Sequence, residues 1–302
     1  MKTFWKVLVT FGVLAFFVVV IASIVIMLTQ IGSMPVIGRG SVAVIPLRGM
    51  ITMSGCPGGL FYVEECSQVS VIKQYLNDAS KDSSIKAVVL YVDSGGGNVV
   101  ASRELMRAVK EFDKPVVTWI GEVGASGAYY VASASDYVVA DEDSMTGSIG
   151  VIMFVQHYYE LMDEIGVNVT VIKSGKSKDL GSPFRPMDED EKERMQAMID
   201  EVYSDFVADV AENRNLSVDE VRGFADGSIY LGSEAKKLGL VDENGGFDDA
   251  VDIAGRLGGI EGKPDVKNIK KTIGWKDVLM GGESPDLVDS LMYRRIFKYE
   301  LR

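Results

Sequence analysis

Short apolar runs alternate with helix-like segments over most of the chain beyond residue 40. The runs are rich in Val and Ile and lie at 42–47, 85–92, 115–120, 137–140, 148–155 and 167–172. The segments with helical spacing are 67–79, 99–112, 126–135 and 157–165. This alternation predicts an α/β fold in which a largely parallel sheet is covered by helices. Strands that are buried on both faces are apolar throughout, as these runs are.

The chain changes character after residue 187. Four acidic residues at 188–191 suit the first turn of a helix, where the macrodipole favours negative charge. Apolar side chains then recur at helical spacing between Met195 and Val210, which predicts a long amphipathic helix that packs on another surface. A second helix is predicted at 217–225. Residues 259–302 show no clear period, and we expect them to form a partly disordered C-terminal tail.

Residues 7–28 carry no charge and are dominated by Leu, Ile, Val and Phe. As a helix they would span about 33 Å, enough for a hydrocarbon core of about 30 Å. No cleavage motif of the A-x-A type follows, so a retained transmembrane helix is favoured over a signal peptide. Lys2 and Lys6 precede the segment, so the positive-inside rule predicts a cytoplasmic N-terminus at 1–6 in a single-pass cell-membrane protein. We expect a linker at 29–40 and an extracytoplasmic folded domain at 41–258.

The composition of the chain excludes several classes of binding and metal site. The formal net charge of −12 argues against binding to nucleic acid. The chain has one histidine, His157, so a His-clustered metal site is excluded and no cofactor is predicted. Cys56 and Cys66 lie ten residues apart in a segment that we place outside the membrane. They can form a disulfide there or remain two small apolar residues.

Two glycine-containing turns follow predicted strands and open predicted helices. The first, 93–98, reads Asp-Ser-Gly-Gly-Gly-Asn and is either a tight turn or a loop whose amides bind an anion. The second, 121–130, contains Ser126 at a helix entrance. A serine there is commonly an N-cap, and the functional alternative is a nucleophile. His157 follows 31 residues later and is interpreted as structural, so a nucleophilic Ser126 needs a different base.

A third segment, 173–183, holds three lysines among small residues: Lys173, Lys176 and Lys178. It is either a solvated loop or the source of a lysine general base for Ser126. A free lysine titrates near 10.4, so a base working near neutral pH needs a pKa lower by about 3 units. Spacing alone does not choose among the three lysines.

Five segments in order resemble the signal peptide peptidase A family of membrane-anchored serine proteases, peptidase family S49. They are 93–97, 124–130, 146–151, 174–185 and the pair 226–230 and 235–242, and the resemblance covers roughly residues 41–258. The first departs from the family's N-S-P-G-G loop, because Asp93 replaces Asn and Gly95 replaces Pro. The second matches the family's nucleophile segment, and the fourth matches the segment that carries its general base.

The resemblance implies a Clp protease/crotonase-like β-α-β core with a C-terminal helical region. It implies that Ser126 is the nucleophile, that Lys178 is the base, and that the amides of Gly97 and Gly127 form the oxyanion hole. It also implies a ring-shaped homo-oligomer in which the serine of one protomer meets the lysine of its neighbour. The expected substrates are short apolar peptides, such as signal peptide remnants in the membrane.

Two other functions remain open from the residues. The same fold supports acyl transfer on CoA thioesters, although an extracytoplasmic domain has no access to CoA. The chain could also be a catalytically idle membrane-anchored scaffold that binds peptides.

Overall fold

The computed structural model describes residues 40–56, 58–59, 62–63 and 65–269. The transmembrane segment predicted at 7–28 lies outside these residues, as do the linker up to residue 39 and the tail from residue 270. Within the described part of the chain, no helix combines the length and apolar character that crossing a membrane requires.

A mixed sheet forms the centre of the molecule. Its strands are β1 (Ser41–Arg48), β6 (Ile85–Ser94), β7 (Val116–Ala125), β8 (Tyr137–Ala140), β9 (Met145–Gly147), β10 (Ile229–Leu231), β11 (Glu243–Asn244) and β12 (Asp265–Asn268). The main path runs β10-β9-β7-β6-β1-β12, and β8 joins β7 to β11. Only the β9–β10 pair is antiparallel. The largely parallel sheet predicted from the sequence is therefore confirmed.

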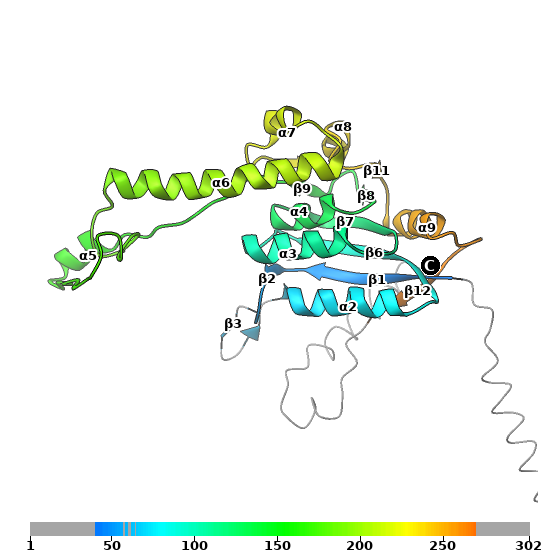
Figure 1. Ribbon diagram of the computed structural model, residues 1–302, viewed down its shortest axis with the longest axis horizontal. Coiled ribbons are helices and arrows are strands. Elements are labelled where there is room, and N and C mark those ends of the chain that lie inside the picture. The colour runs from blue at the N-terminus through cyan, green and yellow to red at the C-terminus, as the bar shows by residue number, and fades with distance from the viewer. Residues whose placement is uncertain (1–39, 57, 60–61, 64, 270–302) are drawn as a thin grey trace, which may run out of the picture.

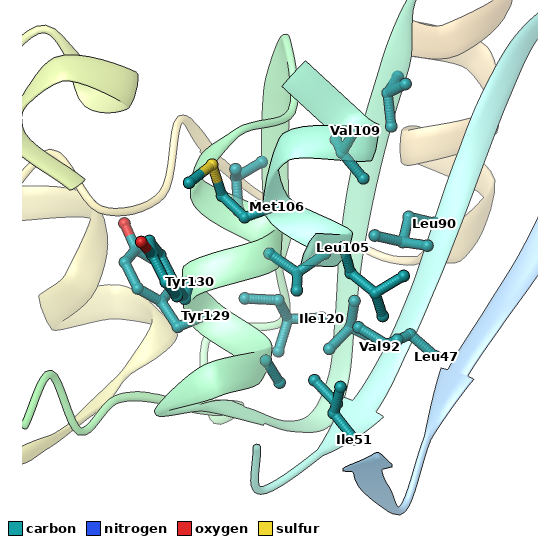
Figure 2. Packing of buried hydrophobic residues seen from close by; sticks show 14 of the residues in the cluster. Leu47, Ile51, Leu90, Val92, Leu105, Met106, Val109, Ile120, Tyr129 and Tyr130 are labelled. Carbon is teal, nitrogen blue, oxygen red and sulfur yellow. The ribbon is translucent and has the colours of Figure 1, made fainter. Parts of the chain in front are cut away.

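Helices cover both faces of this sheet (Figure 1). On one face lie α2 (Val69–Lys81), α3 (Val99–Lys110) and α4 (Gly127–Ser133), and on the other lies α9 (Phe247–Leu257). Strand β6 shows why its sequence is continuously apolar, since Leu90 packs in the first core and Val89 in the second. Figure 2 shows the first core, where Leu90 and Ile120 of the sheet meet Leu105 of α3. Burial on both faces thus explains the strand pattern.

A smaller unit extends beyond the carboxyl end of β1. It contains the parallel pair β2 (Met50–Thr52) and β5 (Cys66–Gln68) and the hairpin β3 (Gly58–Gly59) and β4 (Tyr62–Val63). A disulfide joins Cys56 to Cys66, which resolves the alternatives left open for this pair.

The long helix predicted after residue 187 is present as α6 (Glu189–Arg214). Asp188 and Glu191 form a capping box at its start, which satisfies two amides at the helix N-terminus. Apart from Glu191, its buried side chains lie at 206–211, so only the C-terminal part packs on the body. The shorter helices α7 (Val218–Phe224) and α8 (Gly232–Lys237) follow.

Residues 150–188 leave the body as an extended arm that α6 brings back (Figure 1). The strands predicted at 148–155 and 167–172 are wrong, because the structure has no strand at these residues. The arm's one helix, α5 (Tyr159–Glu164), buries no residue. Apolar sequence predicted burial here, but Ile152, Phe154 and Ile172 are 78%, 85% and 96% exposed.

The end of the described chain also differs from expectation. Residues 265–268, which fall in the predicted tail, form β12 and pair with β1. All four residues of β12 are exposed. The strand therefore lacks the run of buried apolar residues from which the other strands were predicted.

Candidate active site

Ser126 occupies a sharp turn between the end of β7 and the start of α4. Its backbone dihedrals are φ 53° and ψ −125°, a region that residues with a side chain rarely adopt. The amide of Ser126 donates to the carbonyl of Gly147 at 2.8 Å, and its own carbonyl accepts from Tyr130 at 2.9 Å. Strain of this kind costs about 1–3 kcal/mol and persists where the surrounding structure enforces it.

The hydroxyl of Ser126 is not used as a helix cap. The residue stands at the N-cap position of α4, but its side chain accepts no capping hydrogen bond. Ser126 is also partly exposed, whereas all seven residues of α4 are buried. The N-cap interpretation raised by the sequence therefore does not account for this serine, and its oxygen is available for chemistry.

A glycine loop packs directly against this turn. Gly96 has φ +100°, and a Cβ placed on it would lie 2.6 Å from the amide nitrogen of Gly127 and 3.0 Å from Cβ of Ser126. A Cβ on Gly97 would lie 2.2 Å from the carbonyl oxygen of Ile51. The loop can take this path only because these positions carry no side chain.

Strand β2 fixes the backbone of the loop. The amide of Ile51 donates to the carbonyl of Gly96 at 2.9 Å, and the amide of Asn98 donates to the carbonyl of Ile51 at 2.9 Å. The hydroxyl of Ser94 accepts from the amide of Gly96 at 3.1 Å. These bonds leave the amide of Gly97 between two residues whose own amides are engaged.

The amides of Gly97 and Gly127 are close neighbours. A Cβ on Gly127 would lie 3.2 Å from the nitrogen of Gly97. Among the described residues, neither amide donates to a backbone or side-chain acceptor. Gly97 precedes α3 and Gly127 begins α4, so both lie at helix N-termini, where partial positive charge favours an anion. The structure thus brings Ser126 together with the two oxyanion donors that the resemblance implied.

Lys178 lies elsewhere. It is an exposed residue on the arm, which Figure 1 shows extending away from the sheet and its helices. No hydrogen bond or ion pair joins the amine of Lys178 to another described residue. A single chain therefore does not assemble Ser126 with its predicted base.

The loop around Lys178 is nevertheless held by ion pairs. Asp179 accepts from Arg185 Nε at 2.9 Å and pairs with Lys173. Arg185 also pairs with Glu191 at the start of α6. Hydrogen bonds from Arg185 and Lys173 hold the pKa of Asp179 well below its usual value, and Arg185 likewise lowers the pKa of Glu191. The sequence interpretation missed Arg185, although its segment had been singled out.

For two other residues noted in the sequence, the described contacts do not involve Ser126. His157 is exposed two residues before α5, where its ring meets Tyr159 edge-on at 5.9 Å between centroids. Asp93 is half-buried, and its backbone carbonyl accepts from Gly49 at 3.1 Å. Within the described ranges, no cluster of His, Cys, Asp and Glu could hold a metal ion.

Comparison with known proteins places these features in a family. The family model of peptidase family S49 matches residues 108–261. A putative protease of Methanocaldococcus jannaschii is 54% identical over 178 residues, 58% of this chain and 57% of that protein. A putative signal peptide peptidase SppA of Enterococcus faecium is 36% identical over 211 residues, 69% of this chain and 61% of that protein. The matched part of the chain thus spans less than two thirds of either relative.

Two solved structures share the fold at 13% sequence identity. One is a serine-to-alanine mutant of the 1510-N membrane-bound stomatin-specific protease, with a TM-score of 0.52 over 78% of this chain and 100% of that chain. The other is a lysine-to-alanine mutant of the same protease in complex with a substrate peptide. Its TM-score is 0.50, over 80% of this chain and 96% of that chain. At this identity the likeness concerns the fold alone.

Proposed function

The chain belongs to peptidase family S49, and on that premise we propose that it is a membrane-anchored serine endopeptidase with a Ser126–Lys178 dyad. One observation carries the proposal. Ser126 has a strained backbone and a hydroxyl that caps no helix, and it lies beside the amides of Gly97 and Gly127, which donate to no described acceptor. That arrangement suits acyl transfer, which requires a nucleophile and donors for a developing oxyanion.

The reaction follows from these groups. Lys178, in its neutral form, accepts the proton of the Ser126 hydroxyl as the oxygen attacks a peptide carbonyl. The resulting oxyanion is stabilised by the amides of Gly97 and Gly127. The protonated Lys178 then gives its proton to the leaving amine, the peptide C–N bond breaks, and an ester to Ser126 remains. Water, deprotonated by the same lysine, hydrolyses this ester and restores the serine.

Lys178 reaches the serine from a second copy of the chain in this proposal. The arm supports the idea because residues 167–172 form no strand with another described segment and carry alternating apolar side chains. Val167, Val169 and Val171 are each 43–44% exposed. Unpaired extended backbone and exposed apolar surface both favour association. A closed ring of such contacts gives every protomer a complete site.

The substrate and the location belong to the same proposal. Residues 7–28 anchor the chain in the cell membrane with a cytoplasmic N-terminus, and the Clp protease/crotonase-like domain works outside the cytoplasm. Short apolar peptides, such as signal peptide remnants, are the expected substrates, because the anchor keeps the site near them. The name of one relative, a putative signal peptide peptidase, is consistent with this choice.

A catalytically idle peptide-binding scaffold is the main alternative, and acyl transfer on a CoA thioester is a weaker one. Peptide binding alone does not require a serine with a strained backbone beside two amides that donate to no described acceptor. Acyl transfer through an enolate would use the amides but not the hydroxyl.

A fluorophosphonate probe separates these functions, because it forms a covalent bond only with an activated serine. We expect labelling of the full-length protein at Ser126, none in Ser126→Ala, and a loss of at least about 100-fold in rate for Lys178→Ala. Ser80→Ala, a remote change on α2, serves as the control and should label normally. No labelling of the wild-type oligomer between pH 7 and 10 contradicts the proposal and favours the scaffold.

A further inference from the structure

We propose that Arg185 is a positioning residue for the general base. Its guanidinium fixes the loop that carries Lys178 onto the start of α6 and neutralises the carboxylate next to that lysine. The inference rests on the proposed function, in which Lys178 acts as the base, and it adds a residue to that machinery.

The first half of the argument is the contact with Asp179, the residue that follows Lys178. Arg185 Nε donates to the Asp179 carboxylate at 2.9 Å, and Nη2 donates to the backbone carbonyl of Asp179 at 3.2 Å. One guanidinium therefore holds both the side chain and the main chain directly beside the lysine. The side chain of Asp179 is only 11% exposed, although Lys178 itself points to solvent.

The second half is the contact with α6. Arg185 Nη1 and Nη2 donate to the two oxygens of Glu191 at 2.7 and 2.5 Å, a bidentate pair. Glu191 is buried and belongs to the capping box that starts α6. Because the planar guanidinium presents donors along several edges, it can engage both acids at once, which an ammonium group cannot do with the same geometry. The base loop is thereby built onto a helix within a single protomer, before any partner is present.

The charged side chains that surround Arg185 and Asp179 are equal in number for the two signs. Asp179 is paired with Lys173 as well as with Arg185. A hollow between the loop and α6 is lined by further charges of both signs: Lys176 and Arg194 are cationic, whereas Asp188 and Asp190 are acidic. Together with Glu191, four cationic and four acidic side chains lie there, without counting Lys178. Loss of Arg185 leaves Asp179 paired with Lys173 alone and gives this cluster a net charge of −1, and a nearby negative charge favours the protonated amine.

A purely structural ion pair would give a different result from a positioning one. If Arg185 only stabilised the arm, its loss would reduce the amount of folded protein and lower the rate equally at every pH. If Arg185 controls the charge felt by Lys178, its loss shifts the pH dependence of acylation toward higher pH. The pH profile therefore decides between the two roles.

The test is the rate of fluorophosphonate labelling at Ser126 in the full-length oligomer between pH 6 and 10. For Arg185→Gln we expect the midpoint of the profile to rise by about one pH unit, and the rate at pH 7 to fall about tenfold and recover at high pH. Arg185→Lys keeps the positive charge but loses the bidentate geometry of the guanidinium. The midpoint of its profile should lie between those of wild type and Arg185→Gln. Lys110→Gln is the matched control, because it also removes one cation from an ion pair, with Glu212, that lies outside this cluster. Its profile should equal that of wild type.

Asp179→Asn/Arg185→Gln keeps the inference testable if Arg185→Gln disrupts the arm. The double variant removes one carboxylate together with one guanidinium, so the cluster keeps its balance of charges and the midpoint should return to the wild-type value. A wild-type midpoint in folded Arg185→Gln, or the same shifted midpoint in the double variant, overturns the positioning role. Lys178→Ala separates this failure from failure of the proposed function: if it labels like wild type, Lys178 is not the base. If Lys178→Ala is inactive while the Arg185→Gln profile is unmoved, only the inference about Arg185 fails.

Discussion

Ile51 and Gly97 lie side by side as a parallel β-bridge that joins strand β2 to the glycine loop of the candidate site. The same strand pairs in register with β5, so that Met50 lies opposite Cys66. Cys66 is bonded to Cys56. The disulfide is thus connected through two strands to the backbone that presents the Gly97 amide.

Removal of this disulfide should weaken the protein and its site together. For Cys56→Ser/Cys66→Ser, the closed loop is short, so we expect the free energy of unfolding to fall by about 2–3 kcal/mol. The labelling rate at Ser126 should fall as well, because β2 loses a constraint. Urea unfolding and labelling of wild type, with and without reductant, provide the comparison. Unchanged stability and an unchanged rate would show that β2 holds the loop without help from the disulfide.

The glycine loop offers a matched pair of substitutions. A Cβ at Gly97 would meet the Ile51 backbone at 2.2 Å, so Gly97→Ala should displace the amide donor and slow acylation by about 100-fold or more. A Cβ at Gly95 has nothing within 4 Å, and Gly95 is not in the left-handed region. Gly95→Ala should therefore keep full activity and gain up to about 1 kcal/mol of stability through the unfolded state. Equal rates for the two variants would contradict the oxyanion role of Gly97.

Tyr130 ties the helix that follows the nucleophile to α6. Its hydroxyl donates to Asp209, and Arg103 of α3 pairs with Asp205 of α6 at 2.8 Å. Figure 2 shows the Tyr130 ring beside Tyr129 at the edge of the core. Burial, and then the bond to Asp209, raises the pKa of Tyr130 far above 10.

Because this pKa is raised in the folded state, the stabilisation from Tyr130 is complete below pH 10 and is lost as pH rises above it. Tyr130→Phe should cost about 1 kcal/mol at pH 8. At pH 10.5 the difference from wild type should shrink by roughly 1 kcal/mol, because only wild type can release this proton on unfolding. Urea unfolding at both pH values measures this. A pH-independent cost for Tyr130→Phe would refute the linkage.

Substitutions of exposed apolar residues on the arm should disrupt the oligomer without unfolding the body. Phe154 and Ile172 are 85% and 96% exposed and contribute nothing to the core of one chain. Phe154→Asp/Ile172→Asp should yield monomers by analytical ultracentrifugation, lose labelling at Ser126 and keep the wild-type melting temperature. Leu257→Asp, a change at the exposed end of α9, should remain oligomeric. An active monomer would mean that the dyad does not need a second copy.

The body of the fold follows from local sequence pattern. The strand predicted at 115–120 ends five residues before β7 does, but the small residues after it and the helix predicted from 126 still place Ser126 at the turn. The glycine loop was found in the same way. The predicted parallel sheet is observed. Successive side chains of its strands, such as Val89 and Leu90, pack into cores on opposite faces, which requires the continuous apolar runs seen in the sequence.

The arm shows where such reasoning fails. A run such as 167–172 has the composition of a buried strand, but composition does not say whether the covering surface comes from the same chain. The Arg185 network was missed for another reason, since several acids lie within reach of its side chain in sequence and only the folded loop selects Asp179 and Glu191. The disulfide likewise required the distance between Cys56 and Cys66, 5.4 Å between Cα atoms, which spacing cannot supply.

Subunit complementation tests the central claim most directly. Ser126→Ala chains keep the lysine arm, and Lys178→Ala chains keep the serine turn, so each homo-oligomer is inactive. Oligomers assembled from a mixture of the two, with mixed composition verified by differential tags, should recover cleavage of an apolar peptide. About one quarter of wild-type activity is expected from an equal mixture, because a working site needs an intact serine and an intact neighbouring lysine. Verified mixed oligomers with no recovered activity would contradict a site shared between two chains.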